Sequence, residues 1–153
     1  MKNNISTIIV IIIIILVIIQ FIPVDFHPAD FDKNDDLFVA VDAPKEVSTL
    51  FHDACYDCHS FETDFPWYSK VAPVSWWLKK HITTGRENLN FSIWTSYNKG
   101  QKLAAYGEII EVVETKRMPL KSYTWMHPKA RLTDDQRSEM SSWATQQEQA
   151  LAK

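Results

Sequence analysis

The residues best suited to chemistry are gathered in one short stretch, Cys55-Tyr56-Asp57-Cys58-His59. A Cys-x-x-Cys-His run is the attachment signature of a c-type haem. In such a site each cysteine sulfur forms a thioether with one vinyl group of the porphyrin, and the adjoining histidine ligates the iron. The chain has only two cysteines, and both lie in this stretch. We therefore interpret Cys55 and Cys58 as the attachment points of one haem c, and His59 as its proximal iron ligand.

The same residues are open to two other interpretations. With His52 added, the stretch offers four nitrogen and sulfur ligands to zinc. A tetrahedral site normally gathers a second ligand pair, however, and the sequence has neither another cysteine pair nor an H-x-x-x-H run. A dithiol centre or a Cys55–Cys58 disulfide is the other alternative, with Cys55 as a low-pKa thiolate at the start of a helix. The motif is expected near the end of its helix, and haem is the interpretation that uses all three motif residues.

The elements around the motif are expected to be helices. A first helix begins at Asp42 or Ala43 and carries the motif at its end, because apolar residues recur along one face: Val47, Leu50, Phe51, Ala54 and Cys58. We predict further helices over residues 73–85 and 101–117. A capping-box pattern at residues 133–136 opens the last one. The predicted fold is an all-α, cytochrome-c-like domain of about four helices over residues 43–153.

The second predicted helix and its neighbours are rich in aromatic residues. Its apolar face should contain Val74, Trp77, Leu78, His81 and Ile82. We expect most of the following tryptophans to lie in the core or against the porphyrin: Trp67, Trp76, Trp77, Trp94 and Trp125. The stretches between the helices, residues 61–73, 86–98 and 118–131, are expected to be loops.

The N-terminus is expected to cross a membrane. Residues 5–22 are apolar except for Ser6, Thr7 and Gln20. As a helix they span about 27 Å, close to the hydrocarbon thickness of a bilayer. A cleaved signal peptide is the alternative, but no small-residue cleavage site follows the run. We therefore predict a single-pass anchor over residues 1–24 and a tether over residues 25–42, which either lifts the domain off the membrane or packs against it.

Charge gives the predicted orientation and excludes one class of partner. Lys2 precedes the apolar run, whereas Asp25 and further aspartates follow it. The positive-inside rule therefore directs the rest of the chain out of the cytoplasm, to the periplasmic face of a bacterial inner membrane. Haem c is attached in that same compartment in bacteria. The net charge is −3 and no basic stripe is apparent, so nucleic-acid binding is not expected.

Several stretches resemble the bacterial haem-binding domain family, small membrane-anchored, c-type-cytochrome-like proteins with one CxxCH motif. The resemblance covers nearly the whole chain and rests on Gln20-Phe21-Ile22-Pro23, Cys55 to Ser60, Pro66-Trp67-Tyr68-Ser69, Ala72 to Trp77, His81 to Ser92 with Gly85-Arg86, Met118-Pro119, Tyr123, His127, Leu132-Thr133 and Trp143. The resemblance implies a haem c domain exposed to the periplasm.

The second axial position on the iron must be supplied from elsewhere in the chain. Met118 precedes Pro119 in the predicted loop before the last helix, which resembles the Met-Pro pair of single-haem cytochromes c. A thioether ligand raises the potential and suits electron transfer. We favour Met118 as the distal ligand. The alternatives are His127, Met126, or an open position with Met118 merely filling a gap.

Three supporting contacts are also expected. His59 should donate its second ring nitrogen to a backbone carbonyl in the loop over residues 61–66. His81 is interpreted as a core histidine hydrogen-bonded to a neighbour, and its alternative roles are a haem-propionate contact or the distal iron ligand. Tyr68 or Arg86 is a candidate partner for a haem propionate.

One-electron transfer between membrane-associated or periplasmic partners is the function these observations favour. It needs no acid–base pair or nucleophile, because the chain only positions the haem and sets its potential. Two alternatives remain open at this point. One is a haem sensor or small peroxidase with an exchangeable sixth ligand, and the other is a haem-carrying accessory subunit of a larger oxidoreductase. The sequence does not identify the redox partner.

Overall fold

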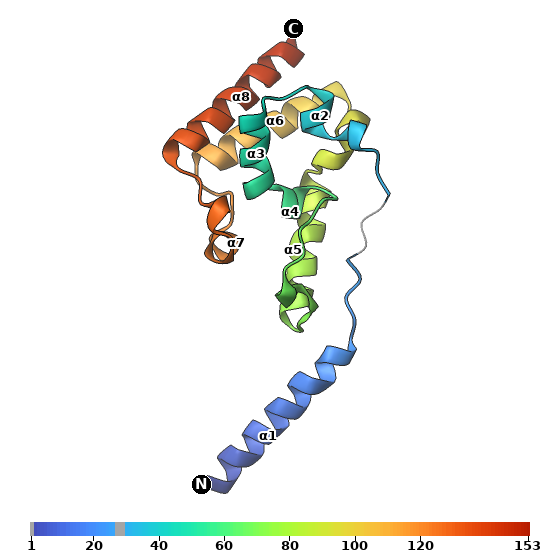
Figure 1. The fold of residues 1–153 in the computed structure, drawn as a ribbon, viewed down its shortest axis with the longest axis vertical. Helices are drawn as coiled ribbons and strands as arrows, with labels where there is room; N and C mark the ends of the chain where they lie inside the picture. The colour runs from blue at the N-terminus through green and yellow to red at the C-terminus, as the bar shows by residue number, and fades with distance from the viewer. Residues whose placement is uncertain (1, 27–29) are drawn as a thin grey trace.

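The computed structural model describes residues 2–26 and 30–153, and in this part of the chain helices joined by loops occur and no strand does (Figure 1). The all-α prediction is therefore confirmed. Residues 27–29 of the predicted tether lie outside the described residues. The α-helices are α1 (Lys2–Ile18), α2 (Leu37–Ala40), α3 (Lys45–Ala54), α4 (Tyr56–His59), α5 (Val74–Asn88), α6 (Lys99–Glu114), α7 (Lys121–Met126) and α8 (Asp134–Ala152). Short 3-10 helices are η1 (Ile19–Phe21), η2 (Lys33–Asp35), η3 (Trp67–Lys70), η4 (Phe91–Ser96) and η5 (Pro128–Ala130).

Helix α1 stands apart from the packed domain (Figure 1). Its window Asn4–Phe21 has a mean hydropathy of 2.9 and buries none of its residues against the protein. It is long and apolar enough to cross a membrane. Gln20 joins it to the domain, because its side-chain amide donates to the carbonyl of Ala72 and accepts from the Ala72 N–H, both at 3.0 Å.

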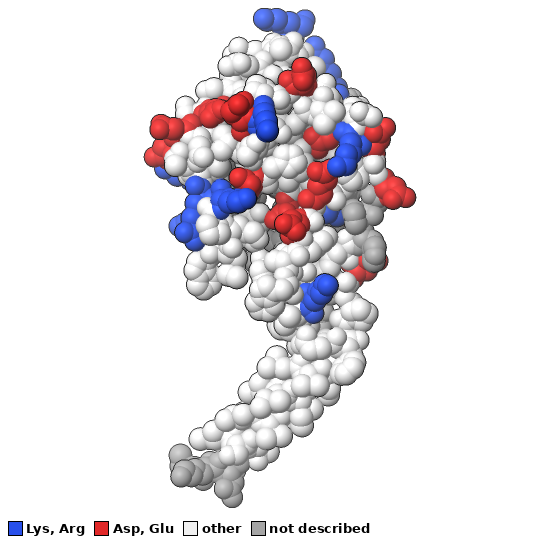
Figure 2. All heavy atoms as spheres, in the orientation of Figure 1, with Lys and Arg blue, Asp and Glu red and all other residues white. Residues whose placement is uncertain are grey.

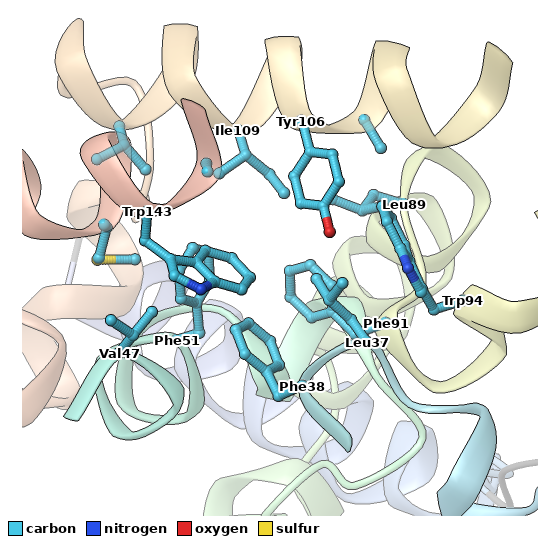
Figure 3. Close-up of a cluster of buried hydrophobic side chains, with 14 of the residues drawn as sticks. Leu37, Phe38, Val47, Phe51, Leu89, Phe91, Trp94, Tyr106, Ile109 and Trp143 are labelled. Atoms are coloured by element: carbon cyan, nitrogen blue, oxygen red, sulfur yellow. The ribbon is translucent and has the colours of Figure 1, made fainter. Parts of the chain in front are cut away.

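The core lies between α3, α6 and α8. Helices α6 and α8 pack along each other, and aromatic rings fill the space beneath them (Figure 3). Phe38 stacks on Trp143 with the ring centroids 5.2 Å apart, and it also meets Phe51 at 4.9 Å. Such ring contacts add stabilisation beyond that of the buried area. Both ends of the described domain sequence, α2 and α8, therefore meet in one core.

The arm before the first predicted helix packs onto the domain. Leu37 and Phe38, within the predicted tether, are buried in the core. The carboxylate of Asp36 caps α2 by accepting the Phe38 N–H at 2.9 Å, and it accepts the phenol of Tyr56 at 2.7 Å. Of the two alternatives for the tether, the structure shows at these residues the one in which it packs against the domain.

Helix boundaries near the motif differ from the prediction. The first helix was expected to carry the motif at its end, but α3 ends at Ala54 and α4 begins at Tyr56. The two are separated because Cys55 leaves the helical conformation, with φ −130° and ψ −34°. The break turns α4 against α5. The predicted capping box at the start of α8 is confirmed, since Thr133 and Gln136 bond each other's backbone.

Helix α5 continues past Gly85 to Asn88, so the predicted end at this glycine is wrong. Gly85 is instead the crossing point with α4, because a Cβ there would lie 2.5 Å from the carbonyl oxygen of Cys58. The predicted apolar face of this helix is also wrong in part, since Val74 and Trp77 are exposed. All three predicted loops contain short helices: η3 in the first, η4 in the second, and α7 and η5 in the third.

The α4–α5 crossing can be tested with Gly85→Ala. The added methyl group must push the two backbones apart, and we expect a loss of about 1–3 kcal/mol in the free energy of unfolding. Gly107→Ala on α6 is the matched control, because its Cβ would meet only the Glu148 carboxylate at 3.6 Å. That control should be neutral or gain about 0.5–1 kcal/mol. Chemical denaturation of the full chain in detergent measures both, and equal effects would contradict the crossing.

Candidate functional site

A cavity of about 620 Å³ lies at the motif, between α3–α4, α5, α6 and the segment before α7. Ligand sites typically measure about 300–1,000 Å³. Cys55, Cys58 and His59 line it on one side, and Met118 lines it as well. The structure therefore brings together the four residues that the sequence singled out, although Met118 is about 60 positions from the motif.

His59 is held so that one ring nitrogen is free to face a ligand. Its Nδ1 lies 3.0 Å from the carbonyl oxygen of Leu89, which can only accept, so Nδ1 carries the proton. The prediction that this carbonyl belongs to the 61–66 loop is wrong, because the carbonyl that contacts the ring is that of Leu89, which follows the end of α5. Burial lowers the pKa of His59 and favours the neutral imidazole. Neutral imidazole with Nε2 unprotonated is the form that ligates iron.

The two thiols are unlike those of a dithiol redox centre. Burial is the main cause that raises the pKa of Cys55 to about 12 and that of Cys58 to about 11. Redox-active cysteines have a lowered pKa, because the thiolate is the nucleophile. Both cysteines are free and half-buried at the cavity wall. The burial that raises both pKa values therefore does not favour the dithiol alternative.

The zinc alternative also lacks a ligand set. In the part of the chain that the structure describes, no three side chains of His, Cys, Asp or Glu are grouped closely enough to hold a metal ion. His52 stacks on the ring of Tyr56, with the centroids 3.6 Å apart. Its ring is exposed and does not line the cavity.

The two variable residues of the motif connect it to distant parts of the chain. Tyr56 donates to Asp36, as described above. Asp57 accepts the phenol of Tyr123 at 2.7 Å through Oδ2, and the N–H of Asp64 at 2.8 Å through Oδ1. Burial and the bond to Asp57 raise the pKa of Tyr123, so its phenol stays protonated and donates. Sequence reasoning missed Asp57, because the signature leaves this position free.

Met118 is fixed through its backbone. Its N–H donates to the carbonyl of Val112 at 3.1 Å, and its own carbonyl accepts from Nη1 of Arg137 at 2.7 Å. The same nitrogen donates to Val113 at 2.9 Å. The end of α6 and the start of α8 therefore hold the methionine backbone together. Its side chain is half-buried at the cavity wall.

Neither alternative to Met118 lines the cavity. His127 uses both ring nitrogens elsewhere, with Nδ1 3.0 Å from the carbonyl of Tyr123 and Nε2 3.4 Å from the hydroxyl of Tyr68. Met126 is 54% exposed on the far end of α7. Of Met118, His127 and Met126, only Met118 shares a cavity with the motif, and His81, a further candidate for the distal position, lines that cavity too.

The structure also places the remaining polar candidates, Arg86, Tyr68 and His81. Arg86 donates to the carbonyl of Ser60 at 2.8 Å and to the hydroxyl of Thr63 at 2.9 Å, so it fixes the loop after the motif. Neither Arg86 nor Tyr68 lines the cavity, whereas Lys80 and Arg117 do. His81 is hydrogen-bonded as expected, with Nδ1 2.9 Å from the carbonyl of Trp77. It lies on the cavity wall, however, and not in the core.

The cavity suits a porphyrin in the chemistry of its walls. Apolar side chains form most of it: Phe51, Ala54, Leu89, Phe91, Ile109, Val112, Val113, Leu120 and Leu132. A flat apolar ring needs such walls, and two cations are available to its carboxylates. The thiol pair, the neutral imidazole and the thioether complete a donor set that fits haem c.

Comparison with known proteins identifies the family. A model of the haem-binding domain matches residues 14–146. The chain belongs to the haem-binding domain family, and this membership supports haem as its ligand. Neither a search of curated proteins nor a search of solved structures returned a match.

The link between the motif and α7 can be tested with Tyr123→Phe. Removing the hydroxyl leaves Oδ2 of Asp57 without this donor, and we expect a loss of about 1–2 kcal/mol in the free energy of unfolding. In Asp57→Asn protein the same substitution should cost less, because the charge is gone. Tyr97→Phe is the control for losing a hydrogen bond between uncharged groups, because its hydroxyl accepts the N–H of Asn90. An equal cost in both backgrounds would show that the charge of Asp57 adds nothing to the bond with Tyr123.

Proposed function

We propose that the chain is a covalent c-type haem protein that transfers single electrons at the periplasmic face of a bacterial inner membrane. Cys55 and Cys58 form the thioethers to one haem, His59 is the proximal iron ligand and Met118 is the distal one. The observation that carries the proposal is the shared cavity, in which the motif and Met118 line one apolar space of porphyrin size. Membership of the haem-binding domain family supports the same cofactor.

The haem supplies one-electron oxidation and reduction of its iron, and the chain supplies the environment. Leu89 fixes the orientation and tautomer of His59 through the 3.0 Å contact. The apolar walls limit water near the iron, which favours the reduced state and raises the potential. One-electron transfer needs no general base or nucleophile from the residues that line the cavity. Electron transfer therefore follows from position and polarity alone.

Location is supported by the first helix and the charges around it. Helix α1 is apolar enough to span a bilayer. Lys2 precedes it and aspartates follow it, so the positive-inside rule directs the domain outward. In this orientation the motif is in the compartment where haem c is attached.

Covalent attachment is tested by acidified organic solvent. Haem should remain with the purified full chain, because two thioethers hold it. Cys55→Ala and Cys58→Ala should each lose one thioether, and the double variant should release any bound haem into the solvent. The visible spectrum of each phase is the measurement. Extraction of haem from the unmodified chain would contradict the proposal.

The distal ligand is tested with Met118→Ala. The methionine contribution to the low-spin spectrum should disappear, because Met126, the other methionine of this segment, lies outside the cavity. Met126→Ala is the matched control and should leave the spectrum unchanged. His127→Ala should do the same. An unchanged spectrum in Met118→Ala protein, with a change in His127→Ala protein, would reassign the ligand.

A further inference from the structure

Large apolar side chains are exposed at two projecting parts of the domain. We name residues 65–81, which include η3 and the start of α5, the first tip, and residues 121–131, which include α7 and η5, the second tip. Trp67 is 77% exposed in the first tip and Trp125 is 79% exposed in the second. The other exposed apolar side chains of the tips are Val71, Val74, Trp77 and Met126. The expectation that Trp67, Trp77 and Trp125 lie in the core or against porphyrin is therefore wrong.

The two tips also share an unusual charge. Together they contain six of the 16 Lys and Arg residues of the chain and none of its 19 Asp and Glu residues: Lys70, Lys79, Lys80, Lys121, Lys129 and Arg131. The rest of the chain then has ten basic and 19 acidic residues, a net charge of −9 against +6 in the tips. Figure 2 shows mainly white and blue spheres on the two projections directed toward α1. The tips therefore form a basic, aromatic end on an otherwise acidic domain.

The first tip is joined to the end of the apolar helix. Gln20, the next-to-last residue of the window Asn4–Phe21, makes both of its hydrogen bonds to the domain with Ala72 of this tip. Phe26, after the helix, packs on Phe65 with centroids 4.8 Å apart and under the ammonium of Lys79 at 5.7 Å. Both tips lie on the side of the domain that faces α1 (Figure 1).

We propose that the two tips rest on the anionic lipid surface of the bilayer that α1 spans, with Trp67, Trp77 and Trp125 at the level of the headgroups. The proposal rests on the membrane anchoring proposed above. Tryptophan is enriched at membrane–water interfaces, where its ring is apolar and its N–H is polar. Lysine and arginine are attracted to anionic headgroups. A spanning α1 ends at that depth, and the bonds from Gln20 bring the first tip to the same level.

This contact sets the position of the cavity. Lys80 and His81 of the first tip and Tyr123 of the second line the cavity. Trp77 and His81 are one helical turn apart, a rise of about 6 Å. The cavity therefore lies directly above the lipid surface, and electron exchange takes place there and not in the bulk periplasm.

The test uses the full chain in liposomes of phosphatidylcholine and phosphatidylglycerol, with p-benzoylphenylalanine in place of one residue at a time. This aromatic photo-crosslinker replaces Trp67 or Trp125 in the tips, Ile13 in α1, or Gln146, which is exposed on α8. After illumination, mass spectrometry identifies lipid adducts. We expect adducts at positions 13, 67 and 125, and none above background at position 146.

The outcomes separate this proposal from the anchoring on which it rests. Adducts at position 13 without adducts at 67 and 125 would overturn the lipid contact and leave the anchor intact. Crosslinks from 67 or 125 to protein and not to lipid would overturn it too, in favour of a protein partner or a second copy. A lack of adducts at position 13 would contradict the anchor itself.

Charge is tested in the same preparation. Lys70→Glu, Lys121→Glu and Lys129→Glu together should lower the lipid adducts at positions 67 and 125 several-fold and leave those at position 13 unchanged. Lys45→Glu, Lys99→Glu and Lys153→Glu together change the net charge equally at exposed sites outside the tips, and should have no effect. Equal behaviour of the two sets would show that the basic residues of the tips play no part.

Discussion

The close packing of the motif helix α4 against α5 is the constraint on which the rest of the structure depends. At Gly85 the backbones of α4 and α5 come so close that a Cβ would lie 2.5 Å from the carbonyl oxygen of Cys58. Four residues later, the carbonyl of Leu89 accepts from the ring of His59 at 3.0 Å. Helix α5 and the residue that follows it thus fix both the position of Cys58 and the tautomer of His59. A cofactor at this wall would find its donor atoms already oriented.

The two variable residues inside the motif connect it to distant segments of the chain. Tyr56 binds the arm that precedes the domain through Asp36, while Asp57 binds the segment beyond Met118 through Tyr123. Together with its packing on α5, these bonds connect the motif to three other parts of the chain that are far apart in sequence. His59 and Met118 both line the cavity that these ties surround. The segment that contains Tyr123 and the start of α5 extend beyond the cavity as the basic, aromatic tips that we assign to the lipid surface.

Spacing in the sequence was enough to predict the helical fold, the motif and the Met-Pro segment, because each is a local pattern. It was not enough to predict how these parts meet. The carbonyl that holds His59 carries no side-chain signal, so nothing marked Leu89 in advance. The exposure of Trp125 was missed because aromatic residues usually indicate a core. The charge of the tips was missed because their basic residues lie in two segments 40 positions apart.

The proposed function depends most on His59 and Met118 as the two residues that would ligate the iron of a bound haem. The absorption spectrum of the membrane-expressed full chain in both redox states, before and after addition of carbon monoxide, tests it most directly. We predict a six-coordinate, low-spin c-type spectrum in each state, with no carbon monoxide bound by the reduced protein, because Met118 occupies the distal position. A five-coordinate, high-spin reduced spectrum that shifts at once with carbon monoxide would contradict the account and indicate a sensor or peroxidase.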